Sequence, residues 1–161
     1  MNSKADDMDL VMEKDRKKNE HSSAMLCANA IKKELKTKFP NIKFSVKSQN
    51  FAGGNSVTIR YTDGTAKPEV EDVTRKYQYG HFDGSIDLYE YSNTRKDIPQ
   101  AKYVMVERDF SPEAKQKLMK VLAKEYNIAE QIDLSKSFEL FQRWINYEQL
   151  IWKEYQDKAV I

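Results

Sequence analysis

Apolar side chains near the start of the chain recur at helical spacing. Behind a highly charged opening segment, residues 1–21, they lie on one side of a predicted helix, at Ala28, Ile31, Leu35 and Phe39. Ser22 or Ser23 can cap this helix by accepting a backbone hydrogen bond. Pro40 ends it, because the residue before a proline avoids helical geometry.

The pattern then changes to period two. Apolar and polar residues alternate over 42–46 and again over 57–61, on either side of a Gly-Gly segment. This pattern predicts an antiparallel β-hairpin with one buried face, which Asp63 and Gly64 close with a turn. Helical spacing returns over residues 67–79.

A third strand is predicted over residues 102–110, after an irregular segment that extends to residue 100. Its apolar side chains point to both sides of the sheet, at Tyr103, Val104, Met105 and Val106. We therefore expect this strand to be covered on both faces.

Two helices are predicted to complete the chain. Ser111 followed by Pro112 is typical of a helix start. The last helix is expected from about Asp133, with a wide apolar face that contains Leu134, Phe138, Phe141, Ile145 and Trp152. Trp144 and Trp152 are eight positions apart, so they would share a side of this helix. Packing on the domain is the default, and the alternative is a homodimer contact through this helix.

These elements predict an α+β domain with a small antiparallel or mixed three-stranded sheet. The expected order is helix, hairpin, helix, strand, helix, with the helices on one face and an amphipathic helix at the C-terminus. We divide the chain into a charged tail or loose helix over residues 1–21, a core domain over 22–127 and a helical extension over 128–161.

Composition narrows the class of protein. The 161 residues include 27 Lys and Arg against 25 Asp and Glu, a net charge of +2. This balance is too small to identify a nucleic-acid binder, and it excludes a polyanionic mimic of DNA. The single cysteine, Cys27, permits no internal disulfide and suits a reducing compartment. Without a secretory signal or a membrane-length apolar run, the sequence predicts a cytoplasmic protein with no membrane partner.

The stretch "YQYGHFDGSIDLYEYSN", residues 77–93, concentrates aromatic and acidic groups. It contains potential metal ligands and acid–base groups at His81, Asp83, Asp87 and Glu90. Their spacing matches no compact metal motif, so we predict no metal, no cofactor and no catalytic residue here. A second interpretation is that Tyr77, Tyr79 and Phe82 cover the end of the core while the acidic side chains face solvent.

We favour a third interpretation, a recognition surface. Tyr and Phe provide a large contact area with few rotatable bonds, and the glycines let the backbone bend where side chains project. The expected contact residues are Tyr79, His81, Phe82, Asp83, Tyr89 and Tyr91.

The hairpin around "NFAGGNS" offers a different possibility. Its glycines lead into a strand and not into a helix, so it is no phosphate-binding loop, and Phe51 is expected at its exposed tip. Lys43, Lys47 and Arg60 should share the solvent face of the hairpin. A basic sheet face can bind a phosphate backbone, although aromatic stacking groups are not expected on it. Nucleic-acid binding is therefore the alternative function.

Nucleophilic catalysis has little support in the sequence. Cys27 lies among apolar helix residues, where a thiol is usually inert, and no strand-to-helix serine motif occurs. We therefore expect no enzyme activity, with a metal-dependent hydrolase as the third alternative.

"KKELKTKFPNIKFSVKSQNFAGGNSVTIRYTDG" and "VTRKYQYGHFDGSIDLYEYSN" resemble member twenty-nine of the large polyvalent protein-associated domains, over about residues 24–108. Such domains occur in phages and conjugative elements. The resemblance implies an interaction domain of mobile-element origin that binds a host protein or protein–nucleic-acid complex, with counter-defence as one role of this kind. It favours Phe51, Gly53, Gly54, His81, Phe82, Asp83 and Gly84 as partner-binding residues.

Overall fold

The computed structural model describes residues 22–140 and 143–159. The chain begins there with α2 (Ser23–Lys38), whose first turn is capped by Ser22 through its hydroxyl oxygen and the Met25 amide. The predicted apolar side of this helix is confirmed, since Ala28, Ile31 and Leu35 are buried. The tail predicted over residues 1–21 lies outside the described residues.

Three strands form the central sheet, in the order β1 (Ser45–Phe51), β2 (Gly54–Thr62) and β5 (Tyr103–Asp109). The first two pair antiparallel and form the predicted hairpin, while β2 and β5 run parallel. Together with the helices this is an α+β fold, as predicted. The parallel pair requires a crossover, which α3 (Lys67–Thr74) and a short 3₁₀ helix (Arg75–Tyr77) supply.

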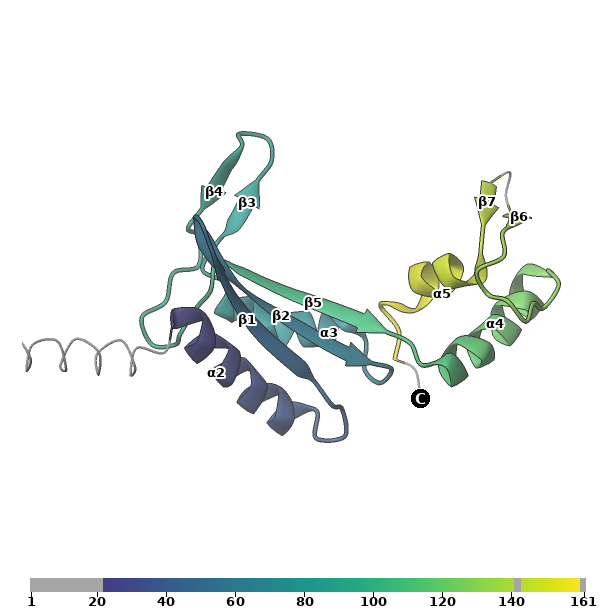
Figure 1. The fold of residues 1–161 in the computed structure, drawn as a ribbon, viewed down its shortest axis with the longest axis horizontal. Coiled ribbons are helices and arrows are strands. Elements are labelled where there is room, and N and C mark those ends of the chain that lie inside the picture. Colours follow the sequence, from purple (N-terminus) through teal and green to yellow (C-terminus); the bar gives the residue numbers. More distant parts are fainter. Residues whose placement is uncertain (1–21, 141–142, 160–161) are drawn as a thin grey trace, which may run out of the picture.

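One face of the sheet carries the first hydrophobic core. Val57 and Ile59 of β2 are fully buried there with Ile31 of α2 and Val70 of α3. The opposite face stays exposed in the described part of the chain: Met105 is 45% accessible to solvent. The prediction that the third strand is covered on both faces is therefore wrong, because the C-terminal elements pack with one another beyond the end of β5 (Figure 1).

The segment predicted to be irregular contains a second hairpin. Its strands are β3 (His81–Asp83) and β4 (Leu88–Glu90), which pair antiparallel. Figure 1 shows this hairpin projecting away from the sheet, near the end where β5 begins.

The C-terminal part forms a second core. It contains α4 (Pro112–Tyr126), β6 (Phe138–Leu140), β7 (Arg143–Ile145) and α5 (Tyr147–Tyr155). The helix start at Ser111 and Pro112 is confirmed: the Ser111 hydroxyl accepts the Ala114 amide hydrogen bond. Buried side chains of α4 and α5, such as Leu122 and Ile151, meet in this core.

The prediction of a single long helix from about Asp133 is wrong. A two-stranded hairpin precedes α5, and Asn146 starts that helix with a capping box shared with Gln149. The division of the chain at residue 127 stays a prediction.

Arg108 ties the second core to the sheet. It is only 5% exposed, and its guanidinium donates hydrogen bonds to the backbone oxygens of Tyr155, Gln156 and Lys158 at the end of α5 and of Gly64 beside the sheet. A cation at a helix C-terminus also interacts favourably with the helix dipole. In the described ranges, no helix is long and apolar enough to cross a membrane.

Candidate binding surface

The β3–β4 hairpin is fixed at its base by a close backbone approach at Gly80. A Cβ atom at this position would lie 1.9 Å from the backbone oxygen of Glu90 and 2.6 Å from the ring of Tyr89. The Gly80 carbonyl oxygen accepts a hydrogen bond from the Gln78 side chain at 2.7 Å. Only glycine therefore lets the two strands meet at this point.

A cluster of tyrosines joins the hairpin to the sheet. The rings of Tyr79 and Tyr91 stack with centroids 5.5 Å apart, and Tyr89 contacts both of them edge-on. Tyr89 also contacts Tyr103 of β5, and its hydroxyl donates to the Lys102 carbonyl oxygen at 2.5 Å. Burial raises the pKa of Tyr89 to about 12, so the hydroxyl stays protonated as this donor.

Large apolar side chains are exposed on the hairpin and at Tyr91, the cluster residue that follows β4. Their accessible fractions are 54% for Phe82, 54% for Ile86, 61% for Leu88 and 66% for Tyr91. Phe82 pairs with Tyr89 and Leu88 with Asp83, so Phe82 and Leu88 point to opposite faces of the hairpin. We call these four residues the finger surface. The interpretation that the rings cover the end of the core holds for Tyr77, which is 5% exposed, but not for Phe82, which is 54% exposed.

The polar residues of the segment serve the hairpin itself. Asp83 accepts hydrogen bonds from the amide and the hydroxyl of Ser85, which lower the pKa of the Asp83 carboxyl group. His81 lies 3.1 Å from the Ser92 hydroxyl and 3.6 Å from a Glu90 carboxylate oxygen. Across residues 22–140 and 143–159, no three His, Cys, Asp or Glu side chains form a group that could hold a metal ion.

Two of the predicted glycines differ in their surroundings. Gly53 has φ +88 in the tight turn between β1 and β2, where a residue without Cβ is favoured. Gly84 is unconstrained, since a Cβ there would meet only the Phe82 ring at 4.0 Å. The third, Gly54, lies beneath the side chains of Phe51 and Lys102.

Phe51 lies at the sheet end of the tyrosine cluster. Its ring is 43% exposed and nearly parallel to that of Tyr103, with centroids 6.3 Å apart. The Lys102 ammonium group lies 5.0 Å from the Tyr89 ring centroid and donates to the Gly53 carbonyl oxygen. Sequence reasoning missed Tyr103 and Lys102, as well as Ile86 and Leu88, because no local pattern marks them.

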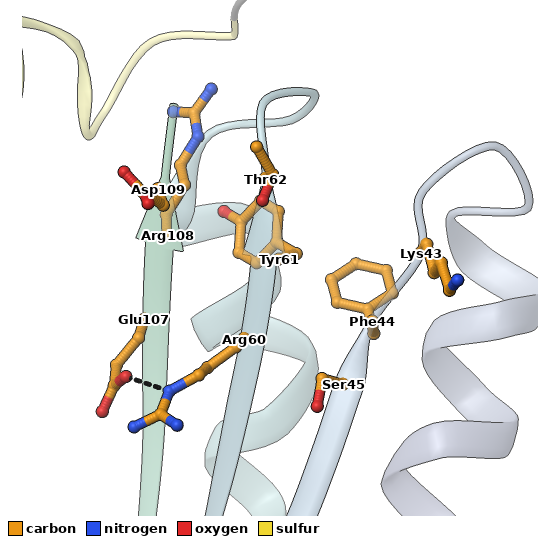
Figure 2. A pocket seen from close by; sticks show the side chains of 9 residues that line it. All are labelled: Lys43, Phe44, Ser45, Arg60, Tyr61, Thr62, Glu107, Arg108 and Asp109. Atoms are coloured by element: carbon orange, nitrogen blue, oxygen red, sulfur yellow. Dashed lines mark hydrogen bonds and ion pairs between the residues drawn. The ribbon is translucent and has the colours of Figure 1, made fainter. Parts of the chain in front are cut away.

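The basic residues lie toward the opposite end of the sheet. Lys47 and Arg60 point to the exposed face, as predicted, whereas Lys43 precedes β1. Figure 2 shows Arg60 turned toward Glu107 of β5, with 2.5 Å between the Arg60 Nε atom and a carboxylate oxygen. Lys43, Arg60 and Glu107 line a depression of about 540 Å³ with Phe44, Ser45, Tyr61, Thr62, Arg108 and Asp109.

Two further predictions concern Cys27 and the tryptophans. Cys27 is fully buried, and burial raises the pKa of its thiol to about 12, which makes it unreactive. Trp144 and Trp152 are 75% and 61% exposed, but they belong to β7 and α5 and not to one helix. A homodimer contact through the C-terminal part stays a prediction.

A family model described as Large polyvalent protein associated domain 29 matches residues 22–111, more than half of the chain. It includes the central sheet, α2, α3 and the β3–β4 hairpin. The resemblance seen in the sequence is thereby confirmed. No curated protein and no solved structure matches the chain significantly.

Proposed function

The chain belongs to the large polyvalent protein associated domain 29 family, and from this premise we propose that it is a non-enzymatic binding domain of mobile-element origin. Its partner is a host protein, which it engages in the cytoplasm with the finger surface. The observation that carries this proposal is the exposure of Phe82, Ile86 and Leu88 on one projecting hairpin, with Tyr91 exposed at its base. Exposed apolar groups gathered in this way are typical of protein interaction sites.

The shape of the hairpin favours a concave partner. Apolar side chains leave both faces of the hairpin, so a flat surface could cover only part of them. A groove that accepts the whole hairpin would bury all four. The tyrosine cluster and the Tyr89 hydroxyl hold the base in place, which lowers the entropy lost on binding.

The charge of the hairpin favours a basic rim around that groove. Residues 77–93 contain Asp83, Asp87 and Glu90 but neither Lys nor Arg. Complementary charge accelerates association and selects among partners, and repulsion from phosphate groups makes nucleic acid a poor ligand for this hairpin.

Affinity capture from nuclease-treated host extract tests the proposal. The wild-type chain should retain a protein that the double variant Phe82→Ser/Leu88→Ser loses. The matched control Ile132→Ser, which alters a 97% exposed apolar residue elsewhere, should retain it. Asp87→Asn should weaken capture more at low salt than at high salt, because it removes one carboxylate and salt screens the attraction to a basic partner. Asparagine is chosen because it tolerates the left-handed backbone at this position.

Two results would contradict the proposal. The first is retention of the same proteins by the wild type and the folded double variant. The second is a melting temperature of the double variant, measured by circular dichroism, that lies far below that of the wild type, because such a loss of stability would assign Phe82 and Leu88 to the core.

A further inference from the structure

The sheet face opposite α2 and α3 carries aromatic, basic, acidic and neutral polar side chains in one plane, together with the exposed Met105. Phe51 lies opposite Gly54, Lys47 opposite Thr58, and Ser45 opposite Arg60 across β1 and β2. On the other side of β2, Ser56 is paired with Tyr103 of β5. Because directly paired residues point to the same side, these residues form one continuous surface.

Aromatic groups occupy one end of this surface. The near-parallel rings of Phe51 and Tyr103 lie above β2, and the Lys102 ammonium group is 5.6 Å from the Tyr103 ring centroid. An exposed ring such as Phe51 is suitable for stacking with a nucleobase, while the half-buried Tyr103 ring supports it from behind. The neighbouring ammonium group can contact the phosphate that follows. The stacking groups that sequence analysis did not expect on the basic face are therefore present.

Cations follow along the same face. Lys47 is exposed and takes part in none of the ion pairs between described residues. Arg60 is also exposed, but Glu107 accepts its Nε–H hydrogen bond and offsets its charge. The face is thus only weakly positive, with two carboxylates, Glu107 and Asp109, that oppose a polyanion.

We infer that this face binds single-stranded RNA, at a site that shares no residue with the finger surface. Rings at one end and cations toward the other match the bases and the backbone of an extended strand. Duplex DNA is a poor fit, since its bases are stacked internally and cannot reach Phe51 or Tyr103. Neutral hydrogen-bonding side chains between the cations, at Ser45, Gln49 and Thr58, can pair with ribose 2′-hydroxyl groups, which favours RNA over DNA.

Fluorescence anisotropy with the full chain and a labelled, unstructured RNA of about 10 nucleotides tests this inference. Two cations (Lys47 and Lys102) predict a slope of about −1.4 for log affinity against log salt, because Glu107 offsets the charge of Arg60. Phe51→Ala should weaken binding about 10-fold, the loss expected for one stacked base, and Phe51→Tyr should restore it.

Charge variants provide the sharper comparison. Lys47→Gln should make the salt slope shallower by about 0.7. Glu107→Gln should tighten binding and steepen the slope, because it releases Arg60. The control Lys33→Gln changes an exposed lysine of α2, the helix that covers the other face, and should leave affinity and slope unchanged.

Several outcomes would overturn the inference. Lack of binding at about 50 mM salt would remove the site altogether. Equal losses of RNA affinity in Lys33→Gln and Lys47→Gln, or an unchanged affinity in Phe51→Ala, would indicate diffuse attraction of a polyanion. Equal affinity for single-stranded DNA or for a DNA duplex of the same length would refute the assignment to RNA. Capture of the host protein is measured in parallel: Phe51→Ala and Lys47→Gln should retain the protein that Phe82→Ser/Leu88→Ser loses. This inference and the proposed function can therefore fail separately.

Discussion

Substitution of Gly80 by alanine should open the β3–β4 hairpin while the central sheet stays folded. The added methyl group would lie 1.9 Å from the Glu90 carbonyl oxygen and 2.9 Å from the carbonyl carbon. Both atoms belong to the backbone of the opposing segment, so no side-chain rotation can relieve the contact. That backbone would have to withdraw by about 1 Å to reach even 3.0 Å, and it would take Tyr89 with it.

The expected cost follows from this displacement. Overpacking of a closely packed site costs about 1–3 kcal/mol. The hairpin has only three residue pairs, from His81–Glu90 to Asp83–Leu88, and so short a pairing is marginal by itself. A loss of this size should therefore favour local opening of the hairpin over global unfolding.

Amide hydrogen exchange measures the effect directly. Exchange in residues 81–83 and 88–90 should become roughly 5- to 150-fold faster in Gly80→Ala, the factor that corresponds to about 1–3 kcal/mol. Exchange in β2 should change little, and capture of the host protein should be lost. Gly84→Ala is the matched control, because its methyl group meets only the Phe82 ring at 4.0 Å. Hairpin exchange rates in Gly80→Ala equal to those of the wild type would refute this reasoning. Equal acceleration of exchange by Gly80→Ala and Gly84→Ala would refute it as well.

Three further predictions concern the cores. Arg108→Met should lower the free energy of unfolding in urea by more than about 3 kcal/mol, because four carbonyl oxygens lose a charged donor. Arg108→Lys should recover only part of this loss. A loss below about 1 kcal/mol would show that these hydrogen bonds do not hold the two cores together. Burial raises the pKa of Cys27 from 9.0 to about 12 and that of Tyr61 from 10.0 to about 12, so the folded chain keeps protons that the unfolded chain releases. The free energy of unfolding should therefore fall as pH rises from about 9 to 12, and it should fall less steeply in Cys27→Ala. Equal pH dependence in the wild type and Cys27→Ala would count against this cause. Tyr147→Phe should cost about 1 kcal/mol in the same urea assay, since the buried hydroxyl donates to a backbone carbonyl at 2.7 Å, and unchanged stability would show that this bond contributes nothing.

Local signals predicted the central fold because each acts within a few residues. Asp63 and Gly64 both have positive φ in the turn after β2, as an Asp-Gly pair allows. Ser111 and Pro112 begin α4 by capping and by a fixed φ angle, neither of which depends on the rest of the molecule. The alternation of apolar and polar residues that predicted β1 and β2 is a local signal of the same kind.

The C-terminal region shows where such signals fail. Strands β6 and β7 have three residues each, too few for period two to appear, and their apolar residues happened to fit helical spacing. A usable signal was present, however: Asn146 and Gln149 are spaced as a capping box and mark the start of α5.

The binding surface was predictable in composition but not in arrangement. The segment 77–93 is correctly placed as a source of exposed rings, at Phe82 and Tyr91. Its connection to Tyr103 and Phe51 depends on the parallel pairing of β2 and β5, which brings together residues about 50 positions apart, and no local pattern encodes it.

Photo-crosslinking in the native host tests the central claim most directly. A photoreactive residue in place of Leu88 should form a covalent adduct with one host protein, and the adduct should disappear when Gly80→Ala is added. The same residue in place of Val121, a comparably exposed position on α4, should give no such adduct. Identical adducts from both positions, or none from position 88 in a folded chain, would contradict the account.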